Sequence, residues 1–153
     1  MLKKDLSSEI KIEPLDLSKN GDKIDQLLHL WKIFNDENLG LTRFRQRFLK
    51  SNSIVLVALD LANRVVGFSV GSVSNTPLHD SPSFELWAIF IEASVRLEGI
   101  GKLLFSTTEG IAQNLGCKRI SVSSEIEQSA MNFYQSVGFK KYANRLIKLF
   151  NKD

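Results

Sequence analysis

The residues with the clearest chemical use stand in a short turn, Arg96-x-x-Gly99-x-Gly101. The turn joins an apolar stretch, Phe84 to Ile91, to a segment from Gly99 to Leu115 whose apolar residues recur at helical spacing. The first backbone N–H groups of a helix have no partner within it, and the helix dipole makes this end positive. Because glycine also lets an anion approach the backbone closely, the pattern predicts a cradle for a diphosphate group.

Two common phosphate-binding fingerprints do not fit this turn. A Rossmann G-x-G-x-x-G would need a glycine where Leu104 stands. A P-loop would need an earlier glycine and a hydroxyl residue directly after Lys102. A nucleotide- or NAD-binding fold is therefore disfavoured.

The turn and a later stretch together resemble the landmarks of the GCN5-related N-acetyltransferase (GNAT) superfamily. Arg96-Leu97-Glu98-Gly99-Ile100-Gly101 is similar to the [Q/R]-x-x-G-x-[G/A] motif with which that family holds the pyrophosphate of acetyl-CoA. Ser129 to Phe139, SAMNFYQSVGF, resembles the second landmark, A-x-x-F/L-Y-x-x-x-G-F. The two landmarks stand in the family's order and spacing, and the resemblance runs from about Ile54 to the end of the chain.

The resemblance implies that acetyl-CoA is the co-substrate and assigns residues to it. The backbone N–H groups of the turn would hold the pyrophosphate, with Arg96 bracing the loop and Lys102 adding charge. The N–H of Ile89 would polarise the acetyl carbonyl. Glu127 stands where many relatives have a cofactor-contacting asparagine, so Asn132 could serve only if it faces the cleft. The assigned cofactor-binding residues are Ile89, Phe90, Ile91, Arg96, Leu97, Glu98, Gly99, Ile100, Gly101, Lys102 and Asn132.

Two residues are candidates for proton transfer, which acetylation of an amine requires because an alkyl ammonium has a pKa of ~10. The resemblance implies that Tyr134 lies near the cofactor sulfur, where its phenol could protonate the leaving thiolate. Glu85 stands where some relatives place a catalytic glutamate, and we expect it to share a strand face with Trp87 and Ile89. Many relatives use a water chain instead, so the identity of the base stays open.

The acceptor amine is not identified by any motif. A polyamine, an aminoglycoside, an amino acid, and a protein N-terminus or lysine all remain candidates. In the family, the region before Ile54 forms much of the acceptor wall. Acidic groups would suit a cationic amine, and the loop residues Asp36, Glu37, His79 and Asp80 are candidates, with His79 an alternative base.

The pattern of apolar residues predicts one α/β (α+β) domain over residues 1–153, with elements in the order βααβββαβαββ. This order fits the GNAT arrangement, a mixed and mostly antiparallel twisted sheet flanked by helices. Glycines at 67 and 71 suggest a bulge or a close backbone approach. The expected strands are Glu9–Leu15, Ile54–Leu59, Arg64–Val73, Phe84–Ile91, Arg119–Ser123 and a final hairpin of Phe139–Lys141 with Leu146–Phe150 around Ala143-Asn144. The expected helices start at Asp22, at a Thr42 N-cap, at Gly99 (ending near Gly116) and at Ser129.

Composition and charge bear on the class of protein, its partners and its location. The chain has 153 residues, 43% hydrophobic and 24% charged, which is ordinary for a soluble globular domain. Its net charge of +3 is spread along the chain, and no apolar run could span a membrane, so neither nucleic acid nor membrane is an expected partner. A single cysteine, Cys117, and the absence of a signal-like leader predict a cytoplasmic location. Two histidines and one cysteine do not make a convincing metal site, so no metal is expected in the chemistry. Dimerisation is common in the family.

Two functional hypotheses follow. The first is an acetyl-CoA-dependent N-acetyltransferase, an acyltransferase that moves the acetyl group to a primary amine by direct attack in a ternary complex. The alternative is a GNAT-like domain that binds acyl-CoA as a sensor or interaction module with little turnover. Glu98 and Glu127, which depart from the family pattern, keep the alternative open.

Overall fold

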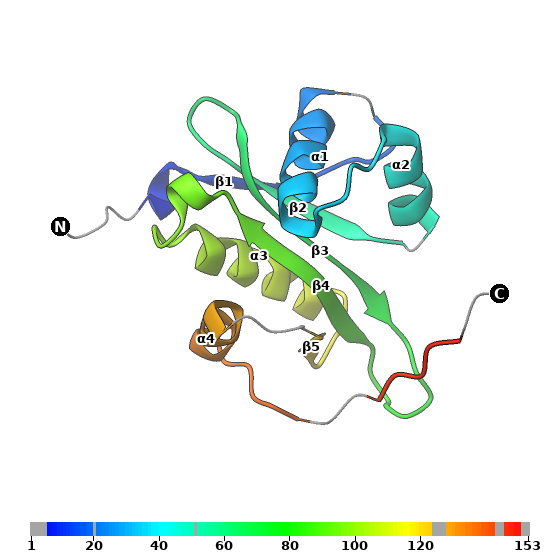
Figure 1. Cartoon of the computed structure of the whole chain (residues 1–153). Helices are drawn as coiled ribbons and strands as arrows, with labels where there is room; N and C mark the ends of the chain where they lie inside the picture. Colours follow the sequence, from blue (N-terminus) through cyan, green and yellow to red (C-terminus); the bar gives the residue numbers. More distant parts are fainter. Residues whose placement is uncertain (1–5, 20, 51, 124–127, 143–145, 151–153) are drawn as a thin grey trace. The chain divides into compact units, whose positions relative to one another are not determined.

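A computed structural model describes residues 6–19, 21–50, 52–123, 128–142 and 146–150. Internal contacts divide the chain into two compact units, Met1–Ser123 and Ser124–Asp153. The assignment of all residues to one domain therefore stays a prediction. The first unit contains η1 (Ser7–Glu9), β1 (Lys11–Pro14), α1 (Asp22–Asn35), α2 (Leu41–Lys50), β2 (Ile54–Leu59), β3 (Val65–Ser74), β4 (Ser83–Ile91), η2 (Ala93–Val95), α3 (Ile100–Asn114) and β5 (Ile120–Val122) (Figure 1). The second unit contains α4 (Gln128–Ser136).

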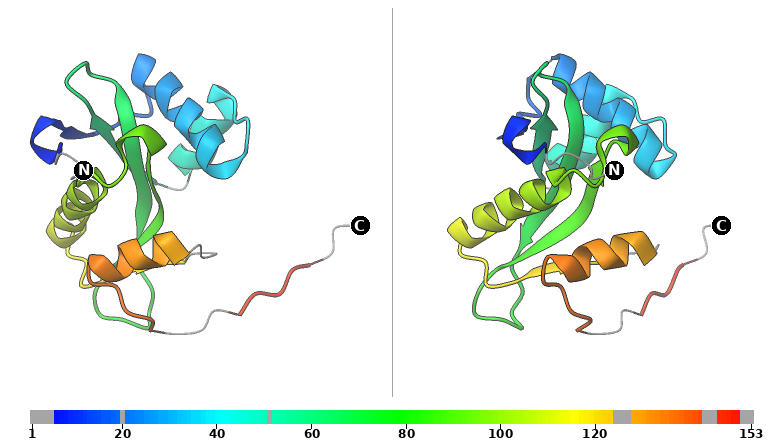
Figure 2. Two further views of the ribbon diagram at one scale, coloured as in Figure 1. Left: turned by 60° about the vertical axis from the view of Figure 1, so that its left-hand side comes forward. Right: turned by 90° about the vertical axis from the view of Figure 1, so that its left-hand side faces the viewer.

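The predicted fold class is confirmed. The five strands form one open sheet in the order β1-β2-β3-β4-β5, in which the first three pairs are antiparallel and β4–β5 is parallel. Helices α1 and α2 cover one face of this sheet and α3 covers the other, as the two turned views show (Figure 2). This explains why β2 and β3 are almost continuously apolar, since both of their faces are buried.

The core on the α1–α2 face is built from aromatic and branched side chains at helical and strand spacing. In α1, the residues at spacing three or four point to the sheet, and Trp31 packs edge-on against Phe48 of α2, with 5.1 Å between ring centroids. The main contributors are Ile24, Leu27, Leu30, Trp31, Phe44, Phe48, Val55, Val57, Phe68 and Val70. On the other face, Ile100 of α3 packs against Ala58 and Val66.

Both glycine positions of β3 lie beside irregularities of the sheet, as the sequence predicted. The β2–β3 register shifts between Ala58 and Leu59, next to the Ala58↔Gly67 pair. The β3–β4 register shifts between Val70 and Gly71, so Trp87 is an extra residue of β4. A Cβ on Gly71 would collide with the carbonyl oxygen of Glu85 and lie 2.5 Å from a ring carbon of Phe84.

We expect Gly71→Ala to lower the free energy of unfolding by about 1–3 kcal/mol, because the added methyl group meets backbone that cannot move aside without breaking the ladder. Denaturant unfolding of the purified variant measures this loss. The matched control is Gly110→Ala in α3, where an added Cβ meets nothing within 4 Å and alanine is the better helix former. Equal stabilities of the two variants would contradict the close β3–β4 approach.

Two local expectations are corrected by the structure. Helix α2 begins at Leu41, and Phe44 already donates its N–H to the carbonyl of Gly40 at 2.9 Å, so Thr42 lies inside the helix and is not its N-cap. The predicted final hairpin is also absent from the described residues. Residues 139–142 and 146–150 contain no strand, and their large apolar side chains find no buried surface to support one: Tyr142, Leu146, Ile147, Leu149 and Phe150 are all exposed. Its turn, Ala143-Asn144, lies outside the described residues.

Candidate active site

The turn that enters α3 contains backbone N–H donors that have no partner in the described chain. Leu97 and Gly99 both take left-handed backbone angles, with φ of 65° and 83°. Gly99 is the N-cap of α3 and supplies no capping side chain. Within the described parts of the chain, none of the N–H groups of residues 97–102 donates to another residue. The turn therefore offers unpaired donors at the positive end of a helix, an arrangement suited to an anionic phosphate.

Glu98 is the one acidic residue of this turn. Its carbonyl oxygen accepts a hydrogen bond from the Leu6 N–H at 3.1 Å, so its backbone is turned toward the N-terminal segment. Its Oε2 atom is buried and has no hydrogen-bond partner among the described residues. The carboxylate therefore does not point fully into solvent, and its charge opposes the binding of an anion at the neighbouring donors.

The backbone of β4 opens toward one edge after the bulge. Pairing between β4 and β5 ends at Leu86↔Val122 in the part of the chain that is described. The N–H of Glu92, just past β4, donates to the carbonyl of Val66 in β3 at 2.8 Å. Because every second residue of a strand directs its N–H and C=O groups to the same side, the backbone groups of residue 90 also face β3. Ile89 and Ile91 therefore direct their backbone groups to the opposite, open edge.

The Arg96 side chain binds the Ile91 carbonyl, which is consistent with the backbone groups of Ile91 facing the open edge. The same contact holds the turn against β4. The Nε of Arg96 donates to the Ile91 carbonyl at 2.8 Å, and its guanidinium carbon lies 5.1 Å from the centroid of the Phe90 ring. The predicted bracing of the loop by Arg96 is thus visible as a contact with β4. The side chains of Phe90 and Ile91 leave the strand on opposite faces, because Phe90 packs on the α1 side and Ile91 on the α3 side.

Glu85 does not share a face with Ile89, and this expectation is wrong. Glu85 pairs with Ser72 and Ile89 pairs with Ser69. These two serines are an odd number of residues apart in β3, so their side chains, and those of their partners, lie on opposite faces of the sheet. The extra residue Trp87 breaks the two-residue alternation between them. Glu85 is exposed and lies on the α1–α2 face, together with Ala88 and Phe90.

The second unit contains the candidate acid. Tyr134 lies in α4 and is 8% exposed, with its ring 5.6 Å from that of Phe133 and 5.4 Å from that of Phe139. Burial raises the pKa of the Tyr134 phenol, because the phenolate would lose its hydration. The phenol therefore stays protonated throughout the neutral range. Asn132 is exposed on the same helix, and Glu127 lies outside the described residues.

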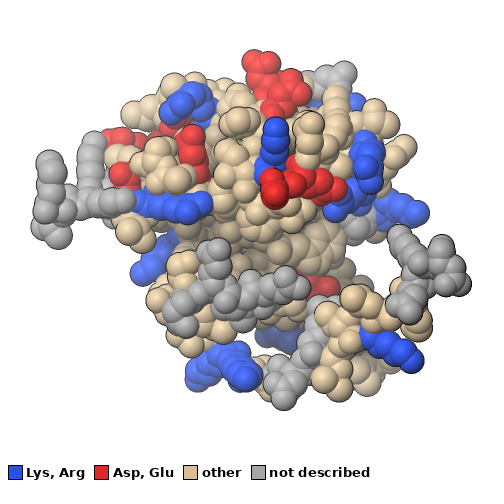
Figure 3. All heavy atoms as spheres, in the orientation of Figure 1, with Lys and Arg blue, Asp and Glu red and all other residues tan. Residues whose placement is uncertain are grey.

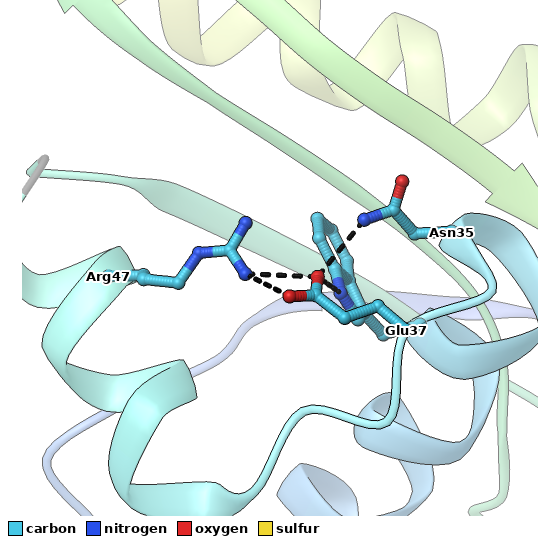
Figure 4. A network of polar contacts seen from close by, with 4 residues as sticks. Asn35, Glu37 and Arg47 are labelled. Carbon is cyan, nitrogen blue, oxygen red and sulfur yellow. Dashed lines mark hydrogen bonds and ion pairs between the residues drawn. The ribbon is translucent and has the colours of Figure 1, made fainter. Parts of the chain in front are cut away.

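Glu37 is the centre of a polar network that joins the end of α1 to α2 (Figure 4). Its carboxylate accepts hydrogen bonds from Arg47 Nη1 at 2.7 and 2.9 Å, from Asn35 Nδ2 at 3.1 Å and from Trp31 Nε1 at 3.4 Å. The hydrogen bond from Arg47, and next that from Trp31, lower the pKa of Glu37. Because its charge is matched by Arg47, Glu37 fixes the loop between the two helices and is not a free anion for a substrate. Asp36, which ends α1 with φ of 48°, is exposed.

We expect Glu37→Gln to lower the melting temperature at neutral pH and to have less effect in acid. The folded state lowers the pKa of Glu37, so its stabilising contribution is present above the pKa of the unfolded chain and disappears as pH falls through the folded value. Thermal unfolding between neutral and acidic pH measures the difference. The control is Glu109→Gln, which removes a carboxylate on α3 that has no ion pair among the described residues. A pH-independent effect of Glu37→Gln would show that the network does not depend on ionisation.

His79 and Asp80 lie at the far end of β4 from Ile89. With Leu78, Ser81, Lys118 and Arg119 they line a depression of about 400 Å³ between the β3–β4 loop and the turn after α3. This loop leads into β4 at Ser83, and at the usual rise of a strand Ile89 is about 20 Å farther along. The geometry does not bring His79 or Asp80 to a group bound at the Ile89 amide.

Two features of this region were missed by the sequence reasoning. Trp87, the bulged residue, is 41% exposed, although the apolar run around it predicted a continuous buried strand. Phe34 is 40% exposed at the end of α1 and its ring lies 5.6 Å from that of Phe90. The glycine at position 71 was the only local signal of the bulge, and nothing in the sequence indicated the pairing of Phe34 with a strand more than fifty positions away.

The described residues contain no group of three or more histidine, cysteine, aspartate or glutamate side chains placed to hold a metal ion. In the same residues, no helix combines the length and the apolar character needed to cross a bilayer.

Comparisons with known proteins agree with the geometry. A family model described as "Acetyltransferase (GNAT) family" matches residues 22–139. The chain is also 30% identical over 86 residues to N-acetyltransferase 8F1 of Rattus norvegicus, a match that covers 53% of this chain and 39% of the rat protein. The matched part thus spans about two fifths of the length of that curated relative.

Several solved structures share the fold. An aminoglycoside acetyltransferase from an uncultured soil metagenomic sample, in complex with sisomicin, superposes with a TM-score of 0.79 at 21% identity, over 97% of this chain and 99% of that one. Glucosamine-6-phosphate N-acetyltransferase from Arabidopsis thaliana gives 0.76 at 15% identity, over 93% and 99%. AAC(6')-Iy in complex with a bisubstrate analog, CoA-S-monomethyl-acetylneamine, gives 0.74 at 19% identity, over 94% and 98%. At these identities the likeness concerns the fold.

Proposed function

Because the chain belongs to the acetyltransferase (GNAT) family, we propose that it transfers the acetyl group of acetyl-CoA to a primary amine by direct attack in a ternary complex. One observation carries the proposal: the free N–H groups of residues 97–102 follow directly on a strand whose Ile89 amide faces the open edge of the sheet. Donors for a diphosphate and a donor for a carbonyl oxygen thus lie along one continuous segment.

The residues present fit the acetyl-CoA molecule that this reaction needs. The N–H groups of Leu97 to Lys102 would hold its pyrophosphate, and the absence of a side chain at Gly99 leaves room for the phosphate oxygens. The open-edge backbone of residues 89–91 would face the pantetheine arm, with Arg96 holding turn and strand together through its bond to Ile91. Glu98 weakens this fit, and Asn132 remains a candidate contact from α4.

In the proposed mechanism, the Ile89 N–H donates to the oxygen of the reacting carbonyl as negative charge develops on it. Loss of such a preorganised donor costs roughly 2.7–4 kcal/mol of transition-state stabilisation in well-measured enzymes. The amine nitrogen forms a bond to the acetyl carbon while the carbon–sulfur bond breaks. The proton lost by the attacking amine passes to Glu85 through water, and Tyr134 donates its proton to the departing thiolate.

Glu85 would act through water because of its position on the strand. It lies on the α1–α2 face, and the strand rise places it about 10 Å or more from Ile89, beyond direct hydrogen-bond reach. The bulge at Trp87 puts Glu85 on the side opposite Ile91, which packs toward α3. In this arrangement the amine approaches from the α1–α2 face.

A thiol-release assay with acetyl-CoA and a panel of primary amines tests the proposal. We expect release of one CoA thiol for each amide formed, with initial rates that follow sequential rather than ping-pong kinetics. Binding of acetyl-CoA without thiol release for any amine of the panel would favour the sensor or interaction module instead. An acetylated enzyme isolated in the absence of amine would contradict direct attack.

A further inference from the structure

Trp87 marks the place where the sheet opens. It is the extra residue of the β4 bulge and follows directly on Leu86, where pairing with β5 ends among the described residues. Its side chain is 41% exposed, whereas Leu86 and Ala88 on either side of it are buried. A large aromatic ring is thus left accessible on a residue two positions before Ile89.

Phe34 adds a second accessible ring near the same strand. It stands at the end of α1, is 40% exposed, and meets the rings of Phe90 and Phe68 edge-on, at 5.6 and 5.9 Å between centroids. Phe90 directly follows Ile89 in β4, so the contact with Phe90 places the Phe34 ring on the α1–α2 face near this part of the strand. An apolar group bound there would contact rings that are already held in place by Trp31 and Phe68.

The charges of this face suit a single ammonium group. Glu37 is neutralised by Arg47, whereas neither Asp36 nor Glu85 has an ion pair in the described chain. On the face shown in Figure 3, acidic side chains are interspersed with basic ones and form no continuous acidic surface. A polycation would need several unmatched carboxylates in one place.

We infer that the acceptor is a primary monoamine carried on an aromatic body, which packs against Phe34 and Trp87 while its amine nitrogen faces Glu85 and the Ile89 amide. The inference rests on the proposed function and specifies its substrate class. Apolar contact with two partly exposed rings supplies the affinity, and the fixed position of the rings orients the nitrogen toward the acetyl carbon.

Steady-state acetylation of 2-phenylethylamine, butylamine and spermidine tests this assignment. We expect kcat/KM for 2-phenylethylamine to exceed that for the other two amines by about tenfold or more, as an aromatic contact worth roughly 1.4 kcal/mol would give. Phe34→Ala and Trp87→Ala should each raise KM for 2-phenylethylamine by about tenfold and change KM for butylamine little. The control is Leu61→Ala, which removes another exposed apolar side chain, in the β2–β3 turn.

Tryptophan fluorescence gives a readout that does not depend on turnover. The chain has two tryptophans, and Trp31 is only 8% exposed, so a saturable response to 2-phenylethylamine in the presence of CoA should come from Trp87 and disappear in Trp87→Phe. A stronger response to spermidine, or an unchanged response in Trp87→Phe and unchanged kinetics in Phe34→Ala, would overturn the inference.

The outcomes separate the inference from the function on which it rests. If acetyl-CoA binds and butylamine is acetylated as fast as 2-phenylethylamine, the inference fails and the acetyltransferase proposal stands. If acetyl-CoA does not bind at all, the proposed function fails and the inference falls with it.

Discussion

Tyr134→Phe is expected to lower kcat for acetyl transfer by about a hundredfold while leaving the Kd for acetyl-CoA unchanged. A positioned general acid contributes about 10²–10⁴-fold to a rate, and phenylalanine keeps the ring while removing the proton that the thiolate needs. Burial raises the pKa of Tyr134, so the phenol remains a donor across the neutral range, and its loss of activity by ionisation would begin only at strongly alkaline pH. Steady-state kinetics and direct titration with acetyl-CoA measure the two quantities.

The chain provides its own control for this substitution. The other tyrosine, Tyr142, is 93% exposed, and Tyr142→Phe should leave kcat unchanged. The Tyr134 hydroxyl has no hydrogen-bond partner among the described residues, so the phenylalanine variant should also unfold at nearly the same temperature. A kcat equal to that of the unmodified protein would remove Tyr134 from the mechanism.

Gly99→Val is expected to raise the Kd for acetyl-CoA at least about tenfold. Gly99 has φ of 83°, where a side chain costs roughly 1–2 kcal/mol and a β-branched one is a rare outlier. The valine therefore forces the turn to relax and also places methyl groups where phosphate oxygens would approach the N–H donors. Isothermal titration with acetyl-CoA gives the affinity, and thermal unfolding gives the accompanying loss of stability.

Gly116→Val separates backbone strain from ligand contact. Gly116 follows the C-terminus of the same helix with φ of 84°, and no atom lies within 4 Å of the position of its Cβ. It should destabilise the fold by a similar amount and leave the Kd for acetyl-CoA unchanged. Equal losses of affinity in both variants would mean that the turn binds nothing and that the effect is one of stability alone.

The turn between β4 and α3 could be predicted from the sequence because its determinants are local. Gly99 and Gly101 stand between an apolar run and a helical repeat, and the structure starts α3 at Ile100 with Gly99 as its N-cap. Gly116 likewise takes the left-handed conformation just beyond the helix. The functional roles of these residues stay predictions, because they depend on a bound molecule.

The bulge at Trp87 could not be predicted from the residues of β4. Its position is set by how β4 aligns with β3, a non-local pairing in which Gly71 allows a close approach to Glu85 and Phe84. Because of this extra residue, the alternation of side chains between the two sheet faces changes phase at Trp87, so residues before and after it no longer follow one two-residue pattern. For this reason the expectation for Glu85 was wrong, even though the strand ends at Ile91 as expected and starts only one residue earlier than expected.

The contacts of the α1–α2 region depend on the folded arrangement in the same way. The sequence marks Glu37 as an acidic loop residue, but its bonds to Arg47 and Trp31 exist only because the two helices are folded against each other. Leu146 to Phe150 was expected to form a strand of the final hairpin, whereas its large apolar side chains are exposed and the segment forms no ladder among the described residues. Periodicity indicates what a segment can form, and a partner surface decides whether it does so.

Thermal unfolding with acetyl-CoA, CoA, NAD and ATP tests most directly the claim that residues 97–102 and the Ile89 amide hold the acetyl donor. A ligand at about one hundred times its Kd stabilises the folded state by ~2.7 kcal/mol, which should raise the melting temperature of a chain of this size by several degrees. We predict such a rise with acetyl-CoA and CoA, none with NAD or ATP, and a loss of the rise in Gly99→Val but not in Gly116→Val. No shift with acetyl-CoA at millimolar concentration would contradict the account, because the turn at Gly99 would then be only a connection between β4 and α3.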